Sequence, residues 1–254
     1  MPPYRFAIRA AGINFLFSVC VALMMAPVVL GIWYPYPFGD MLNMRKLFFI
    51  VLAIHLGIGF GLTYLLSNER KSRRALWIDW TLVASIQWVA LIYGIYVLQN
   101  ARPIALVFER DRFVVVAARE IDSNTLGDAP KGLQDLSWLG PQLLGIRKPV
   151  DNSEFFRDLG MSLVGLEPSR RPGWWLPYSQ VVEEAKAAAR PVAELIARHP
   201  EARADIEQAL KRNCRMNDAI KYLPLTSAKT LDWTMLLSSS GTPCAYIHVD
   251  GFLS

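Results

Sequence analysis

Apolar residues gather in three long runs before residue 100, at about 10 to 33, 47 to 66 and 76 to 98. A helix needs about 20 apolar residues to cross the hydrocarbon core of a bilayer. Each run therefore predicts a transmembrane helix. The first run is longer than the apolar part of a signal peptide, about 7 to 15 residues, and no clear small-residue cleavage site follows it. We expect it to be retained as a helix.

The pattern changes after residue 100. The runs IALVFE and FVVVAA flank a short charged turn and predict a β-hairpin over residues 104 to 116. Residues 127 to 178 contain Gly or Pro every few positions, with apolar patches between them, and predict packed loops and short helices.

The last third of the chain mixes both patterns. Apolar residues recur at helical spacing from Ser179, Pro191 kinks or restarts that helix, and EARADIEQALKR predicts another. DWTMLLS and AYIHV predict a second hairpin around SSGTP. The expected fold is a three-helix transmembrane bundle in residues 1–100, followed by a small α+β domain in residues 101–254.

Charge indicates which side of the membrane this domain occupies. Residues 1–100 hold eight Lys and Arg against three Asp and Glu, whereas residues 101–254 hold nineteen of each, so the net charge of +5 belongs to the membrane part. Basic residues concentrate before the first run and in the SNERKSRRA loop, which places both in the cytoplasm. The C-terminal domain then lies outside the cytoplasm. It has no basic patch, which argues against nucleic-acid binding.

Two cysteines, Cys214 and Cys244, fall in the α+β domain, and Cys20 falls in the first apolar run. In an oxidising compartment the pair can close a disulfide, but spacing alone leaves two unrelated thiols as an alternative.

Signals for catalysis are scarce. His55, His199 and His248 have no second His or Cys at the spacing of metal ligands. The nearest to a paired-carboxylate site is Glu109 with Asp111, and both flank the hairpin turn, where charge normally faces solvent. We expect no enzyme activity, metal, cofactor or small-molecule substrate.

Polar residues inside the apolar runs are more informative, because they are expensive in lipid and face a bundle interior or a partner. Counting about 1.5 Å per residue places Asn14 and Asp79 near the cytoplasmic face, and His55 and Gln87 near the middle of the bilayer. These groups either hold the three helices together, with Asp79 reaching the interface, or receive a fourth helix from a client protein.

Ordered motifs extend over nearly the whole chain: WYPYPF, KSRR, Asp79, Gln87, ALIYG, ARPIALVFERDRF, LSWLGP, RPGWWLPY and a terminal DWT with HVDGF. Together they resemble the TfpX/TfpZ type IV pilin accessory proteins. The most specific motif is ARPIALVFERDRF, directly after a membrane helix.

The resemblance implies a bacterial inner-membrane protein, with a cytoplasmic N-terminus and a periplasmic C-terminal domain, that binds and stabilises a particular major type IV pilin. The bundle would shield the transmembrane helix of the pilin, and the periplasmic domain would recognise the pilin head with the edge of the 104 to 116 hairpin or the RPGWWLPY surface. The lipid bilayer is the other partner. The candidate partner-binding residues are Asn14, His55, Asp79, Gln87, Arg102, Phe108, Arg112, Trp174 and Trp175.

Two alternatives remain at this point. RPGWWLPY can simply fill the core, as aromatic side chains usually do. The protein can also be a membrane-bound enzyme that modifies pilin, which would need an acid, base or nucleophile in a cleft, drawn from Asp79, Asp111, His199 and His248.

Overall fold

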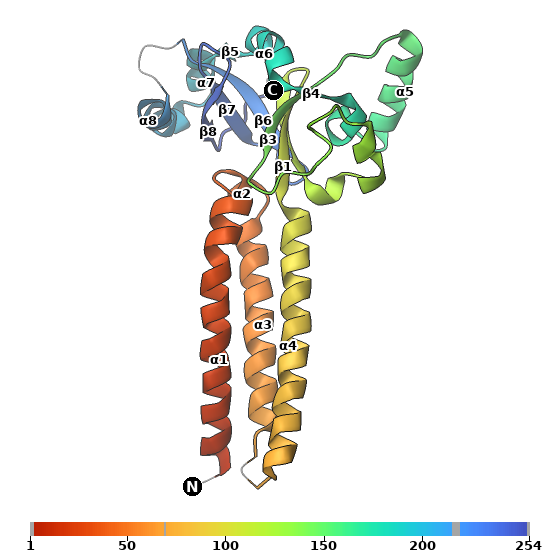
Figure 1. Cartoon of the computed structure of the whole chain (residues 1–254). Helices are drawn as coiled ribbons and strands as arrows, with labels where there is room; N and C mark the ends of the chain where they lie inside the picture. Colours follow the sequence, from red (N-terminus) through yellow and green to blue (C-terminus); the bar gives the residue numbers. More distant parts are fainter. Residues whose placement is uncertain (1–2, 69, 215–218, 253–254) are drawn as a thin grey trace. The chain divides into compact units, whose positions relative to one another are not determined.

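The computed structural model describes residues 3–68, 70–214 and 219–252 (Figure 1). The chain forms two compact units. The helical unit comprises the described residues up to Pro35 together with Asn43–Ala101. The sheet unit comprises Tyr36–Leu42 and the described residues from Arg102 onward. A short segment between the first two long helices is therefore part of the sheet unit.

The helical unit contains α1 (Pro3–Pro27), the π-helical turn η1 (Val28–Trp33), α3 (Met44–Leu66) and α4 (Arg73–Ala101). All three long helices are long and apolar enough to cross a membrane, which confirms the three predicted helices. Each extends a few residues beyond its apolar run, because backbone hydrogen bonding continues through flanking polar residues such as Arg73 and Asn100. Both α1 and α4 pack on α3.

The sheet unit is built on one mixed sheet with the strand order β4-β3-β1-β2-β6-β7-β8, and β5 pairs with β6. The strands are β1 (Pro103–Glu109), β2 (Arg112–Ala117), β3 (Gln142–Ile146), β4 (Trp175–Pro177), β5 (Arg190–Pro191), β6 (Lys221–Ser227), β7 (Trp233–Leu237) and β8 (Pro243–Ile247). The two predicted hairpins, β1–β2 and β7–β8, are confirmed. The α+β class is confirmed with them.

Helices surround this sheet. They are α2 (Phe38–Met41), α5 (Asn152–Leu163), α6 (Val182–Ala188), α7 (Val192–Arg198) and α8 (Arg203–Asn213), with the 3-10 turns η2 (Ala118–Glu120), η3 (Ser123–Asp128), η4 (Pro168–Arg170), η5 (Pro172–Trp174), η6 (Tyr178–Gln180) and η7 (Pro200–Ala202). The predicted restart at Pro191 is confirmed, since this proline directly precedes α7.

Both faces of the central strands are buried. On one face Leu106 and Phe108 pack with α2 and α6, and on the other Ala105 and Val107 pack with the segment that follows β2. Strands covered on both faces have nearly continuous apolar sequences. This explains the unbroken run IALVF at the start of the unit.

Strands β3, β4 and β6 were not expected. Strand β6 contains Pro224, and a proline within an apolar run argues against an interior strand. In the structure β6 nevertheless lies between β2 and β7, and its pairing with β2 begins only at Leu225, one residue after the proline.

The expectation of a free hairpin edge is wrong. The β1–β2 hairpin lies in the middle of the sheet, because β1 also pairs with β3 and β2 also pairs with β6. The backbone groups on its outer sides are therefore already used, and a partner strand cannot add there.

Candidate functional site

A cluster of polar side chains joins α1 to α4 inside the helical unit. The amide of Asn14 donates to Gln87 Oε1 at 2.8 Å, and Gln87 Nε2 donates to Asn14 Oδ1 at 2.9 Å and to Ser18 Oγ at 3.1 Å. A Cβ atom at Gly59 of α3 would lie 1.9 Å from Gln87 Nε2. The missing side chain of Gly59 thus makes room for the amide pair.

The predicted polar levels are wrong, because Asn14 meets Gln87 and Asp79 does not join them. Asp79 instead pairs with Lys71, with 2.6 Å between Nζ and Oδ2. The helices begin outside the apolar runs used for counting. From Pro3, Asn14 is about 16 Å along α1, and from Arg73, Gln87 is about 21 Å along α4, so the two residues reach similar depths.

His55 does not join the amide cluster. It is buried on α3, where it lines an apolar cavity of about 50 Å³ with residues such as Val21 and Phe48. Within the described part of the chain its Nδ1 has no hydrogen-bond partner. The structure therefore places His55 in the bundle interior, apart from Asn14 and Gln87.

A larger groove lies between α1 and α4. Its volume is about 610 Å³, and its lining is mostly apolar, with Arg9, Asn14 and Thr63 as the polar members. The hydroxyl of Thr63 is buried and finds no hydrogen-bond partner among the described residues. The full lining is Phe6, Arg9, Ala10, Ile13, Asn14, Phe17, Thr63, Trp80 and Val83. This groove is wide enough to receive side chains from another apolar segment.

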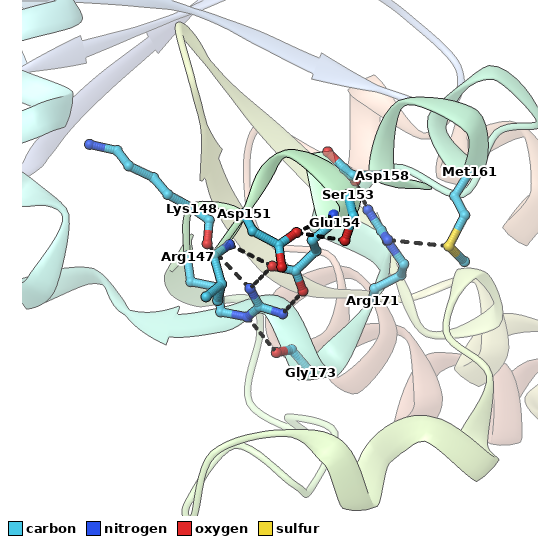
Figure 2. A network of polar contacts seen from close by, with 10 residues as sticks. Arg147, Lys148, Asp151, Ser153, Glu154, Asp158, Met161, Arg171 and Gly173 are labelled. Carbon is cyan, nitrogen blue, oxygen red and sulfur yellow. Dashed lines mark hydrogen bonds and ion pairs between the residues drawn. The ribbon is translucent and has the colours of Figure 1, made fainter. Parts of the chain in front are cut away.

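A network of ion pairs in the sheet unit holds α5 by its polar side (Figure 2). Arg147 donates to both oxygens of Glu154, at 2.9 and 2.6 Å, and the Val150 amide donates to Glu154 Oε2 at 2.6 Å. These bonds, those from Arg147 first, lower the pKa of Glu154 to about 2. The same pairing raises the pKa of Arg147.

Asp158, one turn further along α5, is the buried member of the network. Its side chain is 1% exposed and pairs with Arg171, whose other contact in Figure 2 is the sulfur of Met161. A second partner, Arg110 in the hairpin turn, lies 3.5 Å from Asp158. Burial lowers the pKa of Arg171. The network therefore ties α5 to β3, to the hairpin turn and to the segment before β4.

Trp174 and Trp175 lie in the core of the sheet unit. The guanidinium groups of Arg147 and Arg171 lie 4.3 and 4.6 Å from the centre of the Trp174 ring, and Trp175 Nε1 donates to the Ser169 carbonyl at 2.8 Å. Both rings are buried. Their positions support core packing rather than an exposed RPGWWLPY surface.

A polar cavity of about 510 Å³ opens beside the network. Arginine and carboxylate side chains line it, and those that are drawn in Figure 2 are paired with one another. The lining is Glu120, Asp122, Thr125, Asp128, Arg147, Glu154, Arg157, Asp158, Met161, Leu166, Arg170, Arg171, Pro172, Gly173 and Trp174. The ion pairs of Glu154 and Asp158 beside this cavity hold α5 in position.

The apolar face of α5 points away from this network. Phe155, Phe156, Leu159 and Leu163 are exposed, and so is Val164 directly after the helix. A surface helix usually buries its apolar face and exposes its polar one. The arrangement in α5 is the reverse, which leaves a contiguous stretch of apolar side chains available for contact.

The remaining predicted partner-binding residues are mostly internal. Phe108 is buried against Phe113, with 5.4 Å between ring centres, and Arg112 lies 3.7 Å from Glu167. Arg102 is buried and donates to the Ser137 carbonyl at 3.1 Å. Phe108 and Arg102 are thus buried inside the sheet unit, whereas Arg112 is half-buried.

The expectation that Glu109 faces solvent is also wrong. Its carboxylate is buried and accepts from the Ser169 amide at 3.3 Å, although Asp111 is exposed as expected. The segment that ends at Ser169 folds over the end of β1, a contact between residues 60 positions apart.

The histidines outside the helical unit each contact a neighbouring carboxylate. His199 lies 3.2 Å from Glu201, and His248 lies 2.8 Å from Asp232 while stacking on Trp233. No group of three or more His, Cys, Asp or Glu residues suited to a metal ion occurs in the described ranges.

Cys214, at the end of α8, forms a disulfide with Cys244 in β8. The bond joins a helix to an outer strand of the sheet across a sequence separation of 30. Cys20 in α1 is a free thiol.

Several important residues were not identified from the sequence. They are Ser18 and Gly59 in the helical unit, and Arg147, Glu154, Asp158 and Arg171 in the sheet unit. One signal was present, since Asp151 caps α5 by accepting from the Glu154 amide. An Asp three residues before a Glu is a typical helix start.

Comparisons with known proteins identify the family. A family described as Fimbrial assembly protein FimB matches residues 2–43. The fimbrial assembly proteins of serogroups I and E1 from Dichelobacter nodosus are each 31% identical over 251 residues, which cover 98% of this chain and 97% of each relative. The protein of serogroups C1 and C2 from the same organism is 38% identical over 118 residues, 46% of this chain and 90% of the relative. No solved structure matches the chain. With two relatives aligned over almost its whole length, the chain belongs to the fimbrial assembly protein family.

Proposed function

We propose that this protein acts in fimbrial assembly as an inner-membrane accessory protein that binds and stabilises a major type IV pilin before or during polymerisation. Its relatives are named fimbrial assembly proteins, and its three apolar helices suit a membrane protein. It works as a chaperone rather than as an enzyme. Its N-terminus is cytoplasmic and the sheet unit is periplasmic.

Two features support this orientation. The connection between α3 and α4 contains Arg70 and Lys71, and α4 begins with Arg73 and Arg74. Positive charge of this kind stays in the cytoplasm. The disulfide between Cys214 and Cys244 needs an oxidising compartment such as the periplasm.

The groove between α1 and α4 is the observation that carries the proposal. A pilin waits in the membrane by one apolar helix, and an apolar groove with few polar groups can shield such a helix from lipid. Arg9 supplies positive charge near the start of α1, and the buried hydroxyl of Thr63 has no hydrogen-bond partner among the described residues. Polar groups at membrane depth characteristically meet a partner or line a pathway.

Arg9, rather than Asp79, brings charge to the groove. Asp79 is engaged by Lys71 and does not line the groove, and Gln87 is engaged by Asn14 and Ser18. A guanidinium group in the groove would attract an acidic side chain on the client helix. The client therefore carries a carboxylate near its cytoplasmic end.

The exposed face of α5 is our proposed contact for the globular head of the client. It replaces the hairpin edge, which is paired inside the sheet, and the RPGWWLPY segment, whose tryptophans are buried. Contiguous exposed apolar side chains often mark protein interaction sites. The ion pairs of Glu154 and Asp158 attach the opposite side of α5 to the sheet unit, so the apolar face of the helix stays exposed.

Site-specific photocrosslinking tests the groove. Ile13 and Leu16 are neighbours on α1 with similar exposure, 70% and 64%, but only Ile13 lines the groove. A crosslinking amino acid at position 13 should capture the major pilin in cells, and the same amino acid at position 16 should capture little. Equal capture at both positions, or none at position 13, would contradict binding of the client in this groove.

A further inference from the structure

The direction of the strands defines two ends of the sheet unit. The chain leaves α4 at Ala101 and enters β1 at Pro103, so only Arg102 separates the last membrane helix from the sheet. We call the end of the sheet that begins at Pro103 the proximal end. Strand β3 runs parallel to β1, with Ala105 opposite Gln142. The residues just before Gln142 therefore lie at the proximal end.

A tight loop of four residues, Ser137 to Gly140, lies at this place. Arg102 fastens it, because its Nε donates to the Ser137 carbonyl at 3.1 Å and its guanidinium lies 4.5 Å from the centre of the Trp138 ring. The Ser137 hydroxyl closes the loop by donating to the Gly140 carbonyl at 2.5 Å and accepting from the Leu139 amide at 3.3 Å. The loop is thus attached to the residue that directly follows the membrane helix.

The tip of this loop is apolar and open. Trp138 is 55% exposed and Leu139 is 85% exposed. A leucine so fully exposed gains nothing from the protein core, and the bonds of Ser137 and Arg102 hold it outward. Trp138 and Leu139 therefore form a small exposed apolar surface at the proximal end.

Other exposed apolar side chains lie at the same end. Strand β6 runs parallel to β2 and finishes at the proximal end, so Leu231 in the following turn lies there as well. Tyr36 contacts Trp233 at the start of β7, with 6.3 Å between ring centres. Both are exposed. They continue the apolar character of the Trp138 loop along the proximal end of the sheet.

We propose that Trp138 and Leu139 enter the interface of the bilayer that α4 spans, so that lipid covers this surface. One residue of extended chain reaches only about 3.3 to 3.6 Å, and only Arg102 separates Ala101, the last residue of α4, from Pro103, the first residue of β1. Tryptophan is enriched at the boundary between membrane and water, where its ring contacts acyl chains and its polar edge contacts headgroups. The loop acts as a short anchor that limits rotation of the sheet unit on its connection.

The face of α5 does not share this role. Helix α5 follows the opposite end of β3, after Ile146, and Arg110 in the distal hairpin turn holds it through Asp158. The two apolar surfaces therefore belong to different ends of the sheet. The anchor is also independent of the proposed client, because lipid alone occupies it.

Spin labels in reconstituted full-length protein test the anchor. Cys20 is replaced by Ala to remove the free thiol, and a nitroxide is attached to Leu139→Cys or to the control Val150→Cys. Val150 matches Leu139 in exposure, 84% against 85%, but follows the distal end of β3. The protein is placed in vesicles of phosphatidylethanolamine and phosphatidylglycerol. Collision rates with oxygen, which concentrates in lipid, and with a water-soluble nickel chelate are then measured.

The ratio of oxygen to nickel accessibility should be several-fold higher at position 139 than at position 150. Equal ratios would show that water surrounds both labels and would overturn the proposal. Low accessibility to both reagents at position 139 would show that protein covers the loop, which would overturn it as well. Both substitutions change only an exposed side chain, so circular dichroism should match that of the Cys20→Ala parent.

Discussion

Glu154 makes two separate contacts, one through its side chain and one through its backbone amide. Its carboxylate accepts two bonds from Arg147 and one from the Val150 amide, while its own amide donates to Asp151 at the start of α5. The carboxylate closes the turn before the helix, and the amide completes the helix cap. Both contacts fix the position at which α5 leaves the sheet.

Replacing Glu154 by Gln tests this role through its pH dependence. The pKa of Glu154 falls from 4.5 to about 2 in the folded protein. A lowered pKa stabilises the fold above the unfolded value and loses that effect as pH falls through the folded value. The melting temperature of Glu154→Gln should therefore lie below that of the parent at pH 7, and the difference should shrink between pH 4.5 and 2.

Glu207→Gln is the matched control, because Glu207 pairs with Arg203 on the exposed surface of α8. Such pairs contribute only about 0.3 to 0.5 kcal/mol, so its melting temperature should change little. A pH-independent loss in Glu154→Gln would mean that the charge of the carboxylate is not what holds the turn.

Asp158 shows why sequence motifs did not reveal this network. Its partners Arg110 and Arg171 lie 48 and 13 positions away in the chain. A carboxylate on an amphipathic helix is expected to face water, since most acidic side chains do. Only the fold brings two arginines to it and makes burial possible.

At the scale of elements, Gly59 is a point where α1, α3 and α4 meet closely. A side chain at Gly59 would overlap Gln87 and approach Asn14 Oδ1 to 2.8 Å. Helices in membranes pack closely through small residues and through hydrogen bonds between polar side chains. Gly59 provides the close approach, and the amide pair provides the bonds.

Gly59→Ala should weaken the bundle by about 1 to 3 kcal/mol, the usual effect of overpacking, because the amide pair must move. Gly61→Ala is the control on the same helix, since a Cβ there meets nothing within 4 Å. Unfolding in a denaturing detergent, followed by circular dichroism, compares the two. Equal stability of both variants would show that the amide pair adapts without loss.

Helix α5 is an element whose type was predicted from the sequence but whose buried face was not. Its mix of polar and apolar residues suits a short surface helix, and short helices were expected in residues 127 to 178. Its orientation is reversed, with Asp158 buried and Phe156 exposed. Ion pairing with Arg147 and Arg171 decided this, because apolar residues have no means of competing for those guanidinium groups.

At the scale of the whole molecule, the proposed function assigns the helical unit to the membrane helix of the client and the sheet unit to its soluble head. Removing the protein should therefore expose both parts of the client. Proteases in the cell remove protein that is not properly folded or protected, which lowers its abundance. The steady-state level of the client is therefore a direct test of the proposed function.

In cells that lack this protein, the major pilin should fall several-fold while its transcript stays constant, and expression of the intact chain should restore it. Immunoblotting and transcript measurement provide the comparison. Unchanged amounts of pilin would argue against a stabilising role. A pilin that stays abundant but differs in mass would instead favour an enzyme that modifies it.

The sequence by itself determined the three membrane helices, the two hairpins and the α+β class, because hydrophobic period and turn residues are local properties. It also placed polar residues inside the helices, since each polar side chain in an apolar run stands out.

Tertiary structure alone decided which of these residues meet. Asn14 bonds Gln87, although counting along the helices had placed it at the same depth as Asp79. The β1–β2 hairpin lies between other strands, and the polar side of α5 faces the interior. Helix ends, strand order and ion pairs between distant residues depend on packing across the chain, and packing leaves no local pattern in the sequence.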